Sequence, residues 1–272
     1  MMASAPVGRL IGAGRTAEVF ELPDGHVLKL FHASVPVEWV DVDLRASVLV
    51  HAAGLPAPAC YGLRVVGDRT GIVLGHVAGR PMTAVMRTEP WRITGEARRL
   101  ARLQHAIAGV AAPGLPSGRE RLLGLIRSAV DVPDDLRAAA VDALAGLPDG
   151  DALCHGDLHP DNVLLDAGHA VVIDWMTATR GAAAADVART VLLMQVGSLP
   201  AGRRLDMAMV GLARSVVRST YLRERLRLGD VTRRDVEAWM LPLAVARYGE
   251  RIDPERPKLE RVARGYLASM RT

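Results

Sequence analysis

The chain has 272 residues, half of them hydrophobic, which is enough to bury a sizeable core in one large domain or two modest ones. Its formal net charge is +4, but the arginines are scattered and aromatic residues make up only 4%, which argues against a nucleic-acid partner. No apolar run reaches the roughly 18 residues of a membrane span, the start lacks an apolar signal core, and Cys60 and Cys154 fit no disulfide or metal pattern. We expect a cytoplasmic protein without nucleic-acid or membrane partners.

Lysine is the rare basic residue of this sequence. Only Lys29 and Lys258 occur, so 34 basic residues less 2 leave 32 arginines. A compact ammonium on a flexible stem can do what a planar guanidinium cannot. Each lysine therefore invites a specific explanation.

The first 80 or so residues predict strands and one helix. Strands are expected over 7–14 and 17–23, and the turn "PDG" at 23–25 leads into a third strand, "HVLKLF", which carries Lys29. Apolar spacing predicts a helix over 38–54, ended by a glycine and "LPAP". Two further strands fit the stretch up to Gly79.

Beyond about residue 79 the pattern becomes mainly helical, interrupted once by short strands near 153–174. This change predicts an α+β protein with a small β-rich nucleotide-binding lobe, 1–78, and a larger helical catalytic and acceptor-binding lobe, 79–272.

The stretch "HGDLHPDNVLLDAGHAVVIDW" (155–175) concentrates the chemistry. A loop carrying Asp157 and Asn162 runs into a strand, a turn and a returning strand that ends at Asp174, so a hairpin would gather the three side chains. Phosphoryl transfer from a nucleotide needs one carboxylate to orient the attacking hydroxyl and oxygen ligands for magnesium. Asp157 suits the first role, and Asn162 with Asp174 suits the second.

This stretch resembles the aminoglycoside phosphotransferase family, the small-molecule branch of the protein-kinase-like fold, whose loop reads H-G-D-x-x-x-x-N before a later I-D-[WFL]. The similarity continues in "GAGRTAEV" (12–19), which looks like the nucleotide loop, in "VLK" (27–29), and in "GAAAADVART" (181–190). The order and distances of these motifs cover nearly the whole chain. The resemblance implies a bilobal kinase-like fold, ATP or GTP as phosphoryl donor, and Mg²⁺ as cofactor.

The family pattern also assigns further residues. Lys29, Gly12 and Gly14 would bind the phosphates, and the backbone around Gly75 and Val77 would meet the adenine. His155 and Asp186 would brace the catalytic loop. The acidic partner of Lys29 falls near Asp43, with Asp41 and Glu38 as competitors.

Two features depart from the pattern. Ala17 stands where protein kinases carry a third glycine, and Asp43 is one methylene shorter than the expected glutamate. They motivate an alternative function: a catalytically weak nucleotide-binding regulator of the same fold.

The helices after Asp174 would build the acceptor pocket. Residues 200–272 hold 16 basic and 9 acidic residues, a balance of +7 that disfavours a polycationic aminoglycoside without excluding it. Candidate acceptor contacts are His159, Glu250, Asp253 and Glu255. An aminoglycoside-like antibiotic, a macrolide, an amino alcohol, homoserine or a sugar stay open as acceptors, and resistance and metabolism both stay open as roles.

Two other enzyme classes were weighed against the small-molecule kinase. The alternating His155, Asp157 and His159 would also suit a divalent-metal hydrolase, but that site would not explain Lys29 or the glycine loop. A protein kinase is disfavoured because the stretch between Asp174 and Asp186 has no room for a long activation segment.

Overall fold

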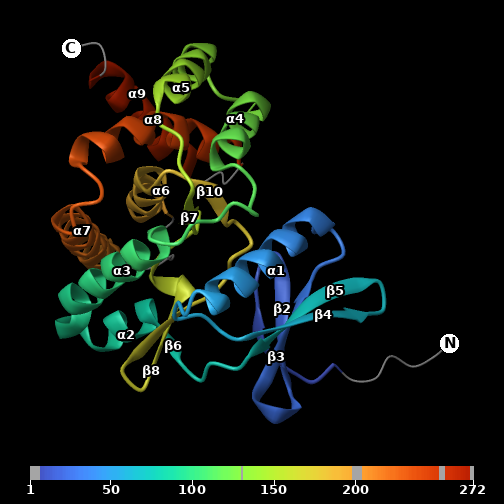
Figure 1. Ribbon diagram of the computed structural model, residues 1–272. Coiled ribbons are helices and arrows are strands. Elements are labelled where there is room, and N and C mark those ends of the chain that lie inside the picture. Colours follow the sequence, from blue (N-terminus) through green and yellow to red (C-terminus); the bar gives the residue numbers. More distant parts are fainter. Residues whose placement is uncertain (1–6, 130, 198–203, 251–254, 270–272) are drawn as a thin grey trace. The chain divides into compact units, whose positions relative to one another are not determined.

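A computed structural model gives the structure of the protein (Figure 1), and it describes residues 7–129, 131–197, 204–250 and 255–269. By its internal contacts the chain forms two compact units. The first comprises residues 1–84 and 161–178, and the second comprises 85–160 and 179–272. The hairpin of the catalytic stretch thus belongs with the amino-terminal residues. The functional division at residue 78 stays a prediction.

A five-stranded antiparallel sheet forms the body of the first unit. Its strand order is β1-β2-β3-β5-β4, and the strands span Arg9–Ala13, Ala17–Leu22, His26–Phe31, Arg69–Gly75 and Cys60–Val66 in that order. Helix α1, Val37–Ala52, lies along one face of the sheet (Figure 1). Ala17, Phe31, Val40 and Ile72 pack together between sheet and helix.

A smaller three-stranded sheet completes the first unit. It consists of β6 (Arg80–Pro81), β8 (Val163–Asp166) and β9 (His169–Val172). The predicted hairpin is confirmed, because Val163 pairs with Val172 and Asp166 with His169. Strand β6 and helix α2, Met82–Thr88, were missed because both are short and carry no clear periodicity.

The second unit is helical apart from one small two-stranded sheet, formed by β7 and β10. Its helices are α3 (Ile93–Ala108), α4 (Gly118–Ser128), α5 (Asp134–Gly146), α6 (Ala183–Val196), α7 (Arg204–Arg227), α8 (Arg233–Gly249) and α9 (Arg256–Ser269). Strands β7 and β10 span Ala152–Cys154 and Thr179–Gly181. Helix α6 contacts both α7 and α8 and is the most buried helix. Its run of small and aliphatic residues suits that central position.

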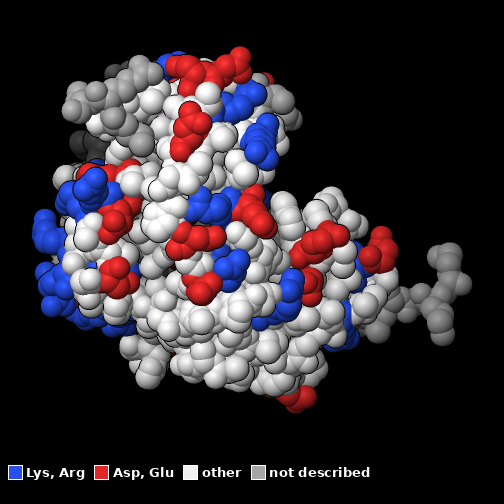
Figure 2. Space-filling view, turned by 45° about the horizontal axis from the view of Figure 1, so that its top comes forward, with Lys and Arg blue, Asp and Glu red and all other residues white. Residues whose placement is uncertain are grey.

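On the face drawn in Figure 2, acidic and basic side chains are interspersed over the middle of the view, and basic side chains gather along its left edge. Among the described residues, no helix is long and apolar enough to cross a membrane.

Gly71 allows β3 and β5 to lie close together beside Lys29. A Cβ at this position would lie 2.8 Å from Leu28 Cδ1 and 2.8 Å from the Lys29 carbonyl oxygen. Because both neighbours are central to the sheet, we expect Gly71→Ala to lower the free energy of unfolding by about 1–3 kcal/mol through overpacking. Urea unfolding would measure the change.

Gly124→Ala in α4 is the matched control, since a Cβ there meets nothing within 4 Å. We expect that variant to be neutral or stabilised by up to about 1 kcal/mol, because alanine favours helix. Equal stability losses in the two variants would contradict the packing argument.

Candidate active site

Lys29 lies at the centre of a buried ion cluster in the first unit. Its Nζ atom is 2.6 Å from Asp43 Oδ2 and 2.6 Å from Asp174 Oδ1. The side chains of Lys29 and Asp43 are 12% and 2% exposed. The ammonium therefore ties β3 to α1 and to the segment that follows β9.

Of the three acids that the sequence offers to Lys29, Asp43 is the one in contact. It lies on the buried face of α1, one turn before Ser47, whose hydroxyl donates to Asp43 Oδ1 over 3.4 Å. Asp41 points to the exposed face instead and pairs with Arg45 at 2.6 Å. Because neighbours on a helix face are three or four residues apart, Asp43 and Ser47 share one side and Asp41 and Arg45 the other. The contribution of Ser47 was not predictable from the sequence.

The two carboxylates keep Lys29 charged. Burial by itself would lower the pKa of Lys29, but the charges and hydrogen bonds of Asp43 and Asp174 outweigh it and raise the pKa above the ordinary lysine value. At neutral pH the side chain is an ammonium held in one place. Such a group suits the binding of phosphate oxygens.

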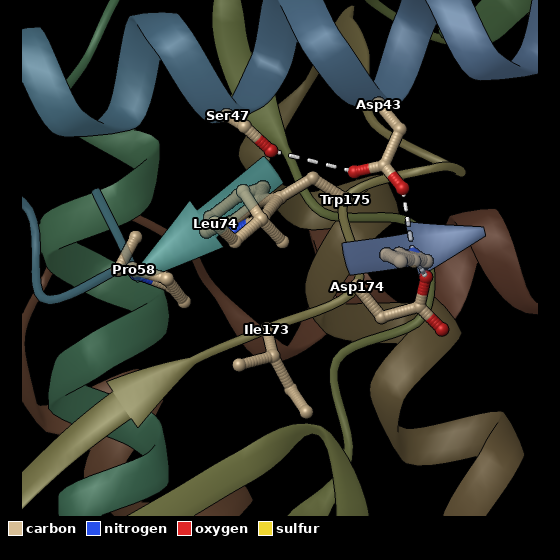
Figure 3. Close-up of a pocket in the computed structure, with 9 residues that line it drawn as sticks. Asp43, Ser47, Pro58, Leu74, Ile173, Asp174 and Trp175 are labelled. Atoms are coloured by element: carbon tan, nitrogen blue, oxygen red, sulfur yellow. Dashed lines mark hydrogen bonds and ion pairs between the residues drawn. The ribbon is translucent and has the colours of Figure 1, made fainter. Parts of the chain in front are cut away.

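A pocket adjoins this cluster, with about 260 Å³ of empty space, open solvent included. Figure 3 shows Asp43 and Ser47 entering from α1, Leu74 from β5, and Ile173 with Asp174 from the opposite side. The pocket thus joins apolar walls to a charged edge.

Asn162 and Asp174 lie on adjacent segments of the first unit. Asn162 directly precedes β8, and its carbonyl oxygen accepts a hydrogen bond from the Ile173 amide over 3.0 Å. The hairpin thus extends one residue pair beyond β8 and β9 and brings Asp174 next to Asn162. An amide oxygen and a carboxylate are the hard oxygen ligands that Mg²⁺ prefers.

Asp174 adopts a backbone conformation that few residues adopt. Its φ is 65°, in the left-handed region, where aspartate is tolerated better than most non-glycine residues. Such strain persists only where the surroundings hold it, and it clusters at functional sites. The Lys29 contact is one interaction that holds Asp174 there.

Asp157 lies in the loop after β7, in the second unit, and is steadied by its own neighbours. Its amide donates to His155 Nδ1 over 3.3 Å, and His155 is fully buried. His159 Nε2 lies 3.6 Å from Asp157 Oδ2. His155 therefore braces the loop from inside, while His159 is paired with the aspartate.

The surroundings of Asp157 keep its carboxyl group ionised. Burial by itself would raise the pKa of Asp157, but the nearby imidazole of His159, followed by Arg189 and His155, holds that pKa well below its usual range. An acid of low pKa is a weak proton acceptor and a good hydrogen-bond acceptor. Asp157 is therefore better suited to orienting a hydroxyl than to deprotonating it early.

Asp186, on α6, holds the loop that carries Asp157 through hydrogen bonds. Its Oδ1 accepts from the Gly156 amide over 2.7 Å, and its Oδ2 accepts from Gln104 Nε2 over 2.8 Å. Asp186 itself is 4% exposed. A helix cap would not make these contacts, so the position is tied to the loop.

A buried polar chain extends this anchor. Gln104 Nε2 also donates to Thr190 Oγ1 over 3.1 Å, and the Thr190 hydroxyl donates to the Leu158 carbonyl over 2.9 Å. The Tyr221 hydroxyl donates to Gln104 Oε1. None of Gln104, Thr190 and Tyr221 was predicted from the sequence. The only signal was Thr190 one turn after Asp186 on the same helix face.

The predicted acceptor residues have different outcomes. Glu250 follows α8 and accepts from Arg189 Nη2 at 2.7 Å and Arg247 Nη1 at 2.6 Å. Asp253 lies outside the described residues, and Glu255 is paired with Arg247. The contact of Glu250 with Arg189 spans 61 residues and has no sequence signature. The contact with Arg247 is local, three residues before Glu250, and was overlooked.

The glycine loop forms the turn between β1 and β2. The Gly14 amide donates to the Ala17 carbonyl over 2.8 Å, and Gly12 lies within β1. A Cβ at Gly12 or Gly14 would meet nothing closer than 3.5 Å. Gly75 ends β5, two residues before Val77.

The site residues thus fall into two groups, one in each unit. Lys29, Asp43, Asn162 and Asp174 are together in the first unit, whereas Asp157 and Asp186 belong to the second. Only four residues separate Asp157 from Asn162 in the chain.

The hydrolase alternative requires a cluster of metal-binding side chains. Within the described part of the chain, no three His, Cys, Asp or Glu residues are arranged to hold a metal ion. A magnesium ion shared with nucleotide phosphates needs only one or two protein ligands. Asn162 and Asp174 fit that second kind of site.

Comparison with known sequences identifies the family. A profile of the phosphotransferase enzyme family, APH, matches residues 7–214, which is most of the chain. The chain belongs to this family. No curated protein matches this phosphotransferase chain at a significant level.

Solved structures with a similar fold include small-molecule kinases. An aminoglycoside-3'-phosphotransferase of type VIII shares 22% identity over 89% of this chain and 94% of its own, with a TM-score of 0.65. A choline/ethanolamine kinase family protein from Mesorhizobium loti shares 18% identity over 97% of this chain and 86% of its own, with a TM-score of 0.61. Amicoumacin kinase hAmiN shares 12% identity over 94% of this chain and 86% of its own, with a TM-score of 0.64. The predicted α+β, protein-kinase-like fold is confirmed.

The buried pairing of Lys29 gives a stability prediction for this phosphotransferase. Asp43→Asn removes one of the two carboxylates that compensate the buried ammonium. We expect the free energy of unfolding to fall, by less than the about 3–5 kcal/mol of breaking a buried pair because Asp174 remains. Chemical denaturation at neutral pH would measure it.

Asp41→Asn is the control on the same helix. Its pair with Arg45 is half exposed, so we expect a change within about 1 kcal/mol. An Asp43→Asn variant as stable as Asp41→Asn would contradict the buried-pair account.

The polar chain behind the catalytic loop gives a second prediction. Gln104→Leu removes the amide that donates to Asp186 and Thr190, and we expect a loss of about 1–3 kcal/mol because buried polar groups lose their partner. The Gly156 amide should also exchange its hydrogen faster, since its acceptor Asp186 is no longer held. Gln195→Leu, at an exposed position of α6, should change neither quantity. Unchanged exchange at Gly156 in the Gln104 variant would show that the chain does not hold the loop.

Proposed function

We propose that the protein is a magnesium-dependent kinase that transfers the γ-phosphoryl group of ATP or GTP to a hydroxyl of a small molecule. The observation that carries the proposal is the Lys29 ammonium, held at 2.6 Å from both Asp43 and Asp174. Family membership supports phosphoryl transfer as the reaction. The amicoumacin kinase neighbour was solved with AMP-PNP and Ca²⁺, which supports a nucleotide donor and a divalent cation.

Lys29 and the glycine loop would bind the donor. The ammonium would contact the α- and β-phosphates, and the loop backbone at Gly12 and Gly14 would cover them. Neither glycine has a positive φ and a Cβ would fit at both, so the turn itself does not require glycine. Close approach of a phosphate to the backbone explains glycine there. The main chain at Gly75 to Val77 would meet the base.

Asn162 and Asp174 would hold the magnesium ion. Bound there, the ion would neutralise charge on the phosphate oxygens. Asp174 is 39% exposed at its side chain, so a carboxylate oxygen is accessible in addition to the one that contacts Lys29. Lys29 would then keep Asp174 oriented through its contact with the other carboxylate oxygen.

Asp157 would orient the acceptor. Its ionised carboxylate accepts a hydrogen bond from the acceptor hydroxyl and directs the oxygen at the γ-phosphorus. The new oxygen–phosphorus bond forms as the bond to the bridging oxygen of the nucleoside diphosphate breaks. The hydroxyl proton passes to the Asp157 carboxylate late in the step, because its oxygen becomes acidic only as it bonds to phosphorus.

One of the two reasons for the regulator hypothesis no longer holds. The shorter acid at position 43 was expected to weaken the lysine pair, but Asp43 reaches Lys29 at 2.6 Å. Ala17 is the remaining departure from the family pattern. It lies in β2 and pairs with Phe31 of β3 in regular register.

Release of nucleoside diphosphate would test the function. Magnesium and ATP or GTP are supplied with aminoglycosides, macrolides, amino alcohols, homoserine and sugars. We expect release that depends on one acceptor class. Asp157→Ala should bind nucleotide normally yet lose about 10²–10⁴-fold in turnover, and Asp174→Asn should lose about tenfold or more in magnesium-dependent nucleotide affinity.

Asp166→Asn is the matched control, because Asp166 is exposed at the turn between β8 and β9. We expect it to behave as the wild type in both assays. Full turnover in Asp157→Ala would refute the assignment of this residue. Nucleotide binding without transfer to any acceptor would favour the regulator.

A further inference from the structure

The peptide that joins Gly156 to Asp157 is held at both of its polar groups. The Gly156 carbonyl oxygen accepts a hydrogen bond from Arg189 Nε over 3.2 Å. The Asp157 amide donates to His155 Nδ1 over 3.3 Å. Gly156 itself has a φ of 78°, in the left-handed region that favours glycine. Because the Asp157 Cα atom directly follows this peptide, the orientation of the peptide sets the direction of the carboxylate.

Arg189 reaches the loop from α6, the helix that also carries Asp186. Asp186 lies one turn earlier, and its Oδ1 accepts from the Gly156 amide over 2.7 Å. Residues three apart on a helix lie on the same side. One face of α6 therefore holds both polar groups of Gly156, the amide through Asp186 and the carbonyl through Arg189.

The guanidinium of Arg189 is itself fixed by charged residues at and after the end of α8. Its Nη2 donates to Glu250 Oε1 over 2.7 Å, and Glu250 Oε2 accepts from Arg247 Nη1 over 2.6 Å. Arg247 also donates to Glu255, from Nε over 2.9 Å and from Nη2 over 3.2 Å. The side chains of Arg189, Arg247 and Glu255 are at most 13% exposed. Because buried charge-assisted hydrogen bonds are strong and directional, these pairs hold Arg189 in one place.

We propose that Arg189 is a positioning residue for Asp157 and that Glu250 acts by holding Arg189. The inference rests on the proposed function, because it takes Asp157 as the residue that receives the acceptor hydroxyl. Arg189 acts in two ways. It fixes the peptide before Asp157, and its charge helps to keep the carboxylate ionised. Glu250, which the sequence offers as an acceptor contact, then supports the catalytic loop instead.

The division of an effect between kcat and KM separates positioning from acceptor binding. With the acceptor that supports diphosphate release, Arg189→Gln and Glu250→Gln should each lower kcat about tenfold to a hundredfold, because small displacements of an orienting group are costly. The KM values for acceptor and nucleotide should stay within about twofold of the wild type. Arg189→Lys keeps the charge but not the planar fork, so it should recover part of the loss.

A double-variant cycle tests whether the two residues act as one unit. Because Glu250 acts through Arg189, the double variant should be no more than about twofold slower than Arg189→Gln, whereas independent defects would multiply. Arg233 and Glu237 are the matched control, an exposed pair on α8 at 3.7 Å. Arg233→Gln and Glu237→Gln should each leave kcat and KM unchanged.

Amide hydrogen exchange tests the positioning without turnover. When the Arg189 contact is lost, the peptide before Asp157 can rotate. The Asp157 amide should therefore exchange about tenfold or more faster in Arg189→Gln and Glu250→Gln. The Gly156 amide keeps its acceptor Asp186 and should change less. Thermal unfolding shows whether each variant is folded, and Arg189→Lys replaces Arg189→Gln in this comparison if the glutamine variant does not fold.

The outcomes separate this inference from the proposed function. Unchanged exchange at Asp157 would overturn the positioning role and leave the kinase intact. A Glu250→Gln variant that raises KM for the acceptor at constant kcat would do the same, and it would make Glu250 an acceptor contact. Faster exchange at Asp157 in both variants, with nucleotide bound but no diphosphate released from any acceptor, would instead refute the kinase and support the positioning of the loop by Arg189.

Discussion

The Lys29 ammonium determines how the charged residues of the first unit are arranged. A buried lysine charge is stable only beside carboxylates, and Lys29 has two of them, on α1 and after β9. Three segments from distant parts of the chain are therefore fixed relative to one another by a single charge balance. Asp174 is held in a left-handed conformation by the same balance. Nucleotide phosphates and magnesium would enter a site whose charges are already arranged, which lowers the reorganisation needed at the time of transfer.

Two aspartates of the second unit, Asp186 and Asp157, differ in their environments. Asp186 is buried and serves the backbone of the catalytic loop, whereas Asp157 is partly exposed and kept ionised by its neighbours. The first acid has its oxygens filled by Gly156 and Gln104. The second is paired with His159 at the loop surface. Environment alone separates a structural aspartate from one suited to chemistry, as in other enzymes that use two acids in two roles.

Much of this arrangement was predictable from sequence because it depends on local patterns. The strand that carries Lys29, the hairpin before Asp174 and the presence of α1 all follow from periodicity and turn residues. Gln104 and Tyr221 were not predictable, since an isolated glutamine and tyrosine in helices have no signature, and their contacts span 82 and 117 residues. The pair of Glu250 with Arg189 was missed for the same reason, since it spans 61 residues. Both carboxylate oxygens of this predicted acceptor residue accept from arginines.

The overall charge of the carboxy-terminal helices shows why a count cannot define a pocket. Residues 200–272 carry 16 basic and 9 acidic side chains, yet Arg225 is fully buried against Asp230 and Arg247 is paired twice. These charges are neutralised within the unit and contribute little at a distance. What a substrate meets at Asp157 depends on which acids already have partners. Because Glu250 and Glu255 are both paired with arginines, neither adds an uncompensated negative charge there.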